Sequence, residues 1–160
     1  ALDLGKSLTG WAHSDGASGV QQFKKRTGDS SGVVWLQVQA WLGQLLKDHP
    51  TDLIVYEQAH LRGAASTAAA LGMVTCVQIV VAKSTAPRPI ELTSRHSHVI
   101  KAHMIPTGKK MKKDQRKKSR NKQAMIRAAA KRWPGVEILD DNHADALSLL
   151  SLIQSEGFCG

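Results

Sequence analysis

The fold is decided by the stretch that opens the chain, Leu2-Asp3-Leu4-Gly5-Lys6-Ser7-Leu8-Thr9-Gly10. An apolar run, a turn at residues 5–7 and a second run through Ala12 predict a strand that turns back into a second strand. Asp3 lies inside the first run, where a carboxylate is costly unless it is paired or binds a metal ion. The opening therefore predicts a sheet that carries an acidic group.

Three more acidic residues stand at comparable places. Glu57 ends the apolar run 53–57, and Asp141 and Asp145 lie where a helical pattern begins. A spacing of four places the last two on one helical face. Adjacent parallel strands would bring Asp3 beside Glu57. Because hard divalent cations take oxygen ligands, these four carboxylates predict a Mg²⁺ site in a protein that acts on nucleic acid.

Each carboxylate also has a simpler explanation. Asp3 could be a turn residue near Gly5, and either Asp140 or Asp141 could cap the helix that follows it. Glu57 is the most informative of the four, because a buried strand rarely ends in a lone glutamate.

Hydrophobic periodicity and turn signals divide the chain into alternating elements. We expect strands at residues 2–4, 9–12, 20–23, 53–56 and 90–92. We expect helices at residues 30–47, 61–83, 119–133 and 142–156, and residues 94–104 could add a short one. We read the order as β-β-β-α-β-α-β-α-α, which predicts an α/β fold with a mixed sheet, in a single domain over residues 1–160.

The charge of the chain predicts a polyanionic partner. The net charge is +9, and residues 95–132 hold 14 of the 22 Lys and Arg with Asp114 as the one acidic residue. Such a run can neutralise phosphates and release counterions, although a solvated loop or a targeting signal is the simpler alternative. Residues 107–122 have few apolar side chains, so we expect a mobile loop there. The absence of Phe, Tyr and Trp between Arg95 and Arg132 gives no support for single-strand stacking.

Other classes of protein are disfavoured by composition. We expect no membrane partner, because we find no stretch near 18 uncharged apolar residues and no strongly amphipathic basic helix. Cys76 and Cys159 have no metal-binding spacing and read as free thiols in a reducing compartment. With no signal peptide recognised, we expect a cytoplasmic protein of a bacterium or a phage-infected host.

At these acidic residues the chain resembles the RuvC-type Holliday-junction resolvases of the ribonuclease-H-like superfamily. The matching stretches are the opening Leu2 to Gly10, similar to an Asp-x-Gly-x-x-x-Thr-Gly pattern, then Val55-Tyr56-Glu57-Gln58, and finally Ala144-Asp145-Ala146-Leu147. Each motif is weak alone, but three in order with a basic segment before the last are fairly specific. The compact form is most similar to phage or prophage members.

The resemblance implies a ribonuclease-H-like fold, a mixed five-stranded sheet flanked by helices. It also implies a homodimer that cuts four-way DNA junctions by paired nicks, leaving 5′-phosphate and 3′-hydroxyl ends. Two Mg²⁺ ions per site would be held by four catalytic residues, with Asp3 bridging the ions and Glu57, Asp141 and Asp145 holding one or the other. Mn²⁺ suits the same oxygen ligands.

The fourth ligand is open between two residues. Bacterial RuvC proteins place an Asp or His three residues before the last Asp, where this chain has Asn142, and other branches use the four-residue spacing that Asp141 meets. We favour Asp141. His143 points to a different helical face from Asp145 and ranks below both.

The resemblance also suggests which residues contact DNA. The position three after the strand glutamate, which probes the junction centre in the family, is His60. Lys101, Lys109 and Lys122 are the closest matches to the DNA-contacting lysines. The full set of expected DNA-binding residues is His60, Arg62, Lys101, Lys109, Lys110, Lys112, Lys113, Lys117, Lys118 and Lys122.

Two other functions fit parts of the same pattern. A ribonuclease H or a less selective flap and branch nuclease would share the carboxylates, but ribonuclease H carries its catalytic glutamate on a helix and Glu57 ends a predicted strand. A non-catalytic nucleic-acid-binding protein on the same fold would bind with strong salt dependence and give no Mg²⁺-dependent product.

Overall fold

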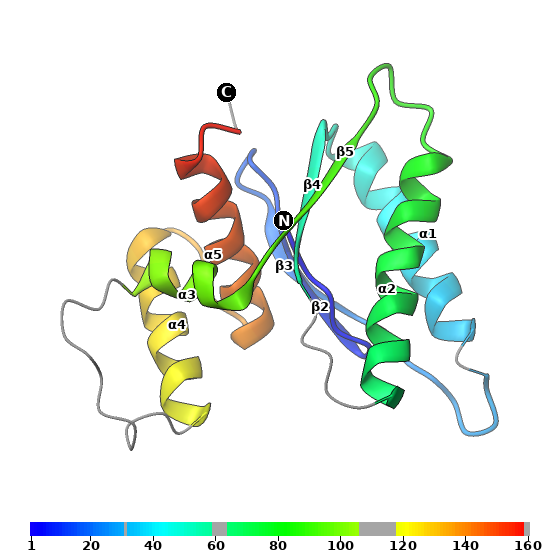
Figure 1. The fold of residues 1–160 in the computed structure, drawn as a ribbon, viewed down its shortest axis with the longest axis horizontal. Coiled ribbons are helices and arrows are strands. Elements are labelled where there is room, and N and C mark those ends of the chain that lie inside the picture. The colour runs from blue at the N-terminus through cyan, green and yellow to red at the C-terminus, as the bar shows by residue number, and fades with distance from the viewer. Residues whose placement is uncertain (31, 59–63, 106–117, 159–160) are drawn as a thin grey trace.

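The computed structural model describes residues 1–30, 32–58, 64–105 and 118–158 (Figure 1). Its strands are β1 (Leu2–Asp3), β2 (Leu8–Ala12), β3 (Ser18–Gln22), β4 (Leu53–Glu57) and β5 (Glu91–Arg95). Its helices are α1 (Gly32–Asp48), α2 (Ala64–Ala82), α3 (Ser97–Met104), α4 (Lys118–Arg132) and α5 (Asp141–Ser155). The predicted elements are therefore present within a few residues of their expected limits.

The strands form one mixed sheet in the order β3-β2-β1-β4-β5. The first three make an antiparallel meander, and β4 runs parallel to both β1 and β5. Helices α1 and α2 cover one face, and α3, α4 and α5 lie on the other (Figure 1). This arrangement confirms the prediction of an α/β fold with a five-stranded mixed sheet between helical layers.

The core lies on both faces of the sheet because neighbouring residues of a strand point to opposite sides. In β4, Ile54 packs with Leu42 and Val77 on the side of α1 and α2. The next residue, Val55, packs with Leu149 among the helices of the other face. The uninterrupted apolar run of β4 is thus explained by burial on two sides.

The region after β5 differs from the sequence expectation. β5 continues to Arg95, because the parallel ladder with β4 extends to the pair Glu57 and Arg95. The short helix that the sequence allowed within residues 94–104 is present and begins at Ser97, so three helices follow β5. Residues 118–122 belong to α4, and the rest of the loop expected at 107–122 lies outside the described residues.

Helix α2 corrects the statement that no long uncharged apolar stretch exists. Its 19 residues have a mean hydropathy of 1.8, which is enough to cross a membrane by length and composition alone, and 22% of it is buried. Ser, Thr and Gln interrupt the apolar residues of this segment, so it does not form an unbroken apolar run in the sequence. In the structure α2 packs against α1, and Met73, Cys76, Val77 and Val80 are buried.

Candidate active site

The first two carboxylates meet because β1 and β4 are parallel neighbours. Leu2 pairs with Tyr56, so the next residue of each strand, Asp3 and Glu57, stands at the same edge of the sheet. This is the carboxyl edge of both strands, where side chains from parallel strands converge. The structure therefore brings together the two residues that the sequence predicted from adjacent strands.

Gly10 brings the start of α5 to the same edge. Gly10 pairs with Asp3 across the antiparallel ladder. A Cβ atom at position 10 would lie 2.0 Å from the carbonyl oxygen of Asn142, in the first turn of α5. Only glycine permits this approach of helix and strand backbones, and the approach places the acidic turn of α5 beside Asp3.

Helix capping is assigned to Asp140. Its side chain accepts a hydrogen bond of 2.8 Å from the backbone N–H of His143, as an N-cap residue does. The alternative that the sequence left open is thus settled for Asp140, and Asp141 does not serve as the cap. The carboxylate of Asp141 instead pairs with the ammonium group of Lys122.

The pKa of Asp3 shows that the other acidic groups lie close to it. Burial raises the pKa of Asp3 to about 8, and the charges of Asp145, Glu57, Asp141 and Asp140 add to the shift in that order. A carboxyl group surrounded by like charges in a dry environment resists ionisation unless a cation is present. The four predicted carboxylates therefore lie within electrostatic reach of one another.

The pKa of Asp145 is also raised, but by less than that of Asp3, and two nearby lysines oppose the shift. Burial and the charge of Glu57 raise its pKa to about 6, while Lys101 and Lys122 act in the opposite direction. Lys101 lies in α3, and its Nζ donates a hydrogen bond of 2.5 Å to Ser97 Oγ. Two of the lysines predicted to bind DNA thus flank the acidic residues from α3 and α4.

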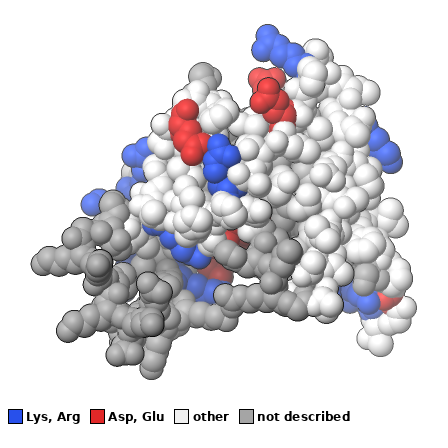
Figure 2. Space-filling model, viewed as in Figure 1, with Lys and Arg blue, Asp and Glu red and all other residues white. Residues whose placement is uncertain are grey.

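The remaining expected DNA-binding residues are not placed. His60, Arg62, Lys109, Lys110, Lys112, Lys113 and Lys117 lie outside the described residues, and Lys118 is described only as the first residue of α4. On the face drawn in Figure 2, Lys and Arg gather over the side of α3 and α4, while the side of α1 and α2 is mostly uncharged. Lys101 of α3 and Lys122 of α4, whose charges act on Asp145, place the carboxylates on this basic side of the molecule.

The donor set fits a hard divalent cation. All four groups offer oxygen, which Mg²⁺ and Mn²⁺ prefer, and their mutual repulsion is what a cation would relieve. Among the described residues, three metal-ligating atoms lie within 4.8 Å of one another only at His13, Asp15 and His49. No three of the four carboxylates meet that criterion, so they stand farther apart than the atoms of this histidine and aspartate group.

Two histidine arrangements were not found from the sequence. His143 is buried, its Nδ1 accepts a hydrogen bond of 3.2 Å from the backbone N–H of Leu139, and burial lowers its pKa. The cluster of His13, Asp15 and His49 joins residues 34 positions apart, so that only the tertiary fold reveals it. A histidine two residues before an aspartate in a turn was the one local signal.

Comparison with known proteins identifies the fold. No family model and no curated protein sequence match the chain. Among solved structures, Thermus thermophilus RuvC in complex with a Holliday junction substrate matches with a TM-score of 0.73 and 11% identity, covering 98% of this chain and 92% of that one. A second structure of Thermus thermophilus RuvC matches with a TM-score of 0.62 and 13% identity, covering 98% and 94%. This chain has the RuvC fold. The resemblance stated from the sequence motifs is thus confirmed at the level of the fold.

Proposed function

We propose that this chain is a metal-dependent, structure-selective endonuclease that resolves four-way DNA junctions by paired strand nicks. One observation carries the proposal: Asp3, Glu57, Asp141 and Asp145 gather at one edge of the sheet, within electrostatic reach of one another, in a chain with the RuvC fold. A fold alone does not define an activity. The carboxylates supply the site that the activity requires.

The four carboxylates would hold two Mg²⁺ ions. Such ions, when bound, make a water molecule nucleophilic and stabilise the leaving oxygen of a phosphodiester. Asp3 has acidic neighbours from β4 and α5, and its pKa is raised further than that of Asp145, so we assign it the central place between the ions. Asp141 is preferred to Asn142 as the fourth ligand, because its charge acts on both Asp3 and Asp145.

Lysines at the edge of the site would bind the DNA backbone. Lys101 and Lys122 lie close enough to Asp145 to lower its pKa, which also places them near a phosphate that occupies the site. Ammonium groups bind phosphates without reading sequence. Branched DNA is the substrate we assign, because the chain carries a net charge of +9 and the matched RuvC structure is a complex with a Holliday junction.

A homodimer would provide the two sites that paired nicks need. The side of the molecule formed by α1 and α2 carries exposed apolar side chains, with Leu36 67% and Leu71 57% exposed. Trp35 is 39% exposed and lies against Gly72 of α2. Exposed apolar patches mark surfaces that bind other proteins. We place the dimer interface on this side, away from the basic surface.

The test is a cleavage assay on a synthetic four-way DNA junction, run beside linear duplex, a flap and an RNA–DNA hybrid, with Mg²⁺ and with a chelator. We expect symmetric nicks in the junction and none in the duplex, only with Mg²⁺. Cleavage of the flap and junction alike would favour the less selective nuclease, and cleavage of the hybrid would favour ribonuclease H. Junction binding without any product would refute the proposed activity and leave a nucleic-acid-binding protein.

A further inference from the structure

A second group of metal-ligating side chains lies at the opposite end of the sheet. His13 and Asp15 belong to the turn that joins β2 to β3, and His49 directly follows α1. Gly10 pairs with Asp3, and His13 is three residues beyond Gly10 along the chain. At the usual rise of a strand, His13 is therefore about 10 Å from Gly10. The group is therefore separate from the four carboxylates.

The turn holds its two residues in a fixed position. The backbone N–H of His13 donates to the carbonyl of Ala17 at 2.8 Å, and that of Gly16 donates to the carbonyl of His13 at 3.2 Å. Gly16 has a φ of 98°, which glycine adopts readily. The carboxylate of Asp15 is oriented by the backbone N–H of Ala17, which donates to Oδ1 at 2.8 Å. Such outer contacts aim a ligand in metal sites.

The three side chains converge on a small volume. His13 Nδ1 lies 3.0 Å from Asp15 Oδ1, and His49 Nδ1 lies 2.7 Å from Asp15 Oδ2. The ligand atoms of the three residues all lie within 4.8 Å of one another. Ligands of a tetrahedral zinc ion stand about 3.3 Å apart, given bonds of roughly 2.0 Å. The two nitrogen–oxygen distances would therefore have to lengthen by about 0.3 and 0.6 Å to match that separation.

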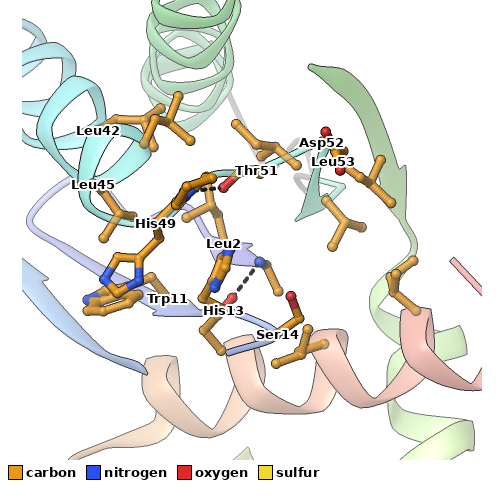
Figure 3. Close-up of a pocket in the computed structure, with 18 of the residues that line it drawn as sticks. Leu2, Trp11, His13, Ser14, Leu42, Leu45, His49, Thr51, Asp52 and Leu53 are labelled. Atoms are coloured by element: carbon orange, nitrogen blue, oxygen red, sulfur yellow. Dashed lines mark hydrogen bonds between the residues drawn. The ribbon is translucent and has the colours of Figure 1, made fainter. Parts of the chain in front are cut away.

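The surroundings leave a route for an ion and a water ligand. The side chains of His13 and His49 are about one-fifth exposed and that of Asp15 is 47% exposed. Both histidines line a cavity of about 220 Å³, which Trp11 and Leu45 also line (Figure 3). The rings of Trp11 and His49 lie 5.7 Å apart, which limits how far the His49 ring can turn away.

We propose that His13, Asp15 and His49 form a site for a transition-metal ion of the zinc type, with water as the fourth ligand. Two imidazole nitrogens and one carboxylate suit Zn²⁺, whereas Mg²⁺ prefers oxygen donors throughout. The bound ion would tie the β2–β3 turn to the end of α1, and would take no part in strand cleavage. Zn²⁺ would thus bind at this end of the sheet and Mg²⁺ at the acidic edge, because the two ends offer different donor atoms.

The test is a Zn²⁺ titration of the full chain by calorimetry after chelator treatment, in excess Mg²⁺ so that the four carboxylates are occupied. We expect one Zn²⁺ per chain, with affinity reduced by at least about tenfold in His49→Ala and in Asp15→Asn, since even the loss of a residue that only orients a metal ligand costs that much. Asp15→Asn keeps the shape of the side chain and guards against misfolding of the alanine variant. His98→Ala, an exposed histidine in α3, is the matched control and should bind as wild type does.

Two results would overturn the proposal. One is the absence of Zn²⁺ uptake by the wild-type chain, which would leave the three side chains as a hydrogen-bonded staple. The other is equal uptake by wild type, His49→Ala and Asp15→Asn, which would place the ion elsewhere. Neither result bears on junction cleavage, so this proposal and the nuclease activity fail independently.

Discussion

Asp3 and Asp15 lie at opposite ends of one sheet, and their surroundings shift the pKa of the two carboxyl groups in opposite directions. Burial and acidic neighbours raise the pKa of Asp3 to about 8. The backbone N–H of Ala17 and the rings of His49 and His13 lower the pKa of Asp15. Among the described residues none pairs with the charge of Asp3, whereas Asp15 is surrounded by hydrogen-bond donors. Asp3 therefore needs a nearby cation to ionise readily, whereas Asp15 is already stabilised as a carboxylate.

This difference sets what metal binding does at each end. At the acidic edge a bound ion would remove repulsion among buried charges, so its binding would strongly stabilise the fold. At the His13, Asp15 and His49 group an ion would have to displace contacts that already satisfy the carboxylate, and its net effect would be smaller. The expected dependence on metal is thus large for Mg²⁺ at the first end and modest for Zn²⁺ at the second.

The largest expected effect is the loss of cleavage in Asp3→Asn. The amide keeps the shape of the side chain but is a poor ligand for an ion between carboxylates, so the cleavage rate should fall by more than about 100-fold. Binding of the four-way junction should persist. Asp52→Asn is the control. Asp52 is exposed and directly precedes β4, so it lies at the other end of that strand from Glu57. Normal cleavage by Asp3→Asn would remove Asp3 from the mechanism.

The same substitution should stabilise the metal-free protein. The folded-state pKa of Asp3 is about 8 and its ordinary value is 3.8, so the folded protein holds the proton more tightly. Stability in a chelator should therefore fall as the pH rises from about 4 to about 8, by an amount on the order of 5 kcal/mol. Asp3→Asn should remove most of that decline.

Urea denaturation in a chelator at pH 5 and pH 8 would measure this effect. Wild type should be less stable at pH 8, and the two proteins should differ most there. Added Mg²⁺ should restore stability to wild type and do little for Asp3→Asn. An identical pH dependence of the two proteins would show that Asp3 is not the strained carboxyl group.

A backbone change should separate geometry from charge at the acidic edge. In Gly10→Ala the new Cβ meets the backbone of Asn142, which cannot swing aside as a side chain can. Overpacking of this kind costs about 2 kcal/mol, and displacement of α5 should weaken Mg²⁺ binding and cleavage although every carboxylate remains.

Gly43→Ala is the matched control for that change. Gly43 lies inside α1, and its Cβ would have no neighbour within 4 Å. Alanine has the higher helix propensity, so this variant should gain about 0.5–1 kcal/mol and cleave normally. If Gly10→Ala matched it in thermal melting and in cleavage, the contact between β2 and α5 would not position the site.

The meeting of Asp3 with Glu57 was predictable because each has a local signal that the fold preserves. Asp3 lies inside an apolar run and Glu57 ends one, and parallel pairing of the two strands then leaves one arrangement for them. The capping role of Asp140 was one of two local options, and the contact of Asn142 with Gly10 decides how the helix sits. The local signals thus identify the residues, and contacts between distant segments determine how those residues are arranged.

Other features depend wholly on tertiary contacts. β5 reaches Arg95 because β4 supplies a partner as far as Glu57, although the sequence also allowed a short helix from residue 94. The meeting of His49 with His13 and Asp15 depends on where α1 ends relative to a turn formed much earlier in the chain. No pattern in either segment encodes that distance, so the sequence predicted one end of the sheet and not the other.

The smallest expected effect concerns the cation beside the acidic edge. Lys122 pairs with Asp141 and is 61% exposed, so Lys122→Ala should change stability by less than about 1 kcal/mol, as for other exposed ion pairs. If Lys122 binds a phosphate, junction affinity should fall a few-fold and the salt dependence should lose about one unit of slope. Lys47→Ala, in the last turn of α1 next to His49, is the control and should change neither. Equal salt slopes for Lys122→Ala, Lys47→Ala and wild type would restrict Lys122 to its pairing with Asp141.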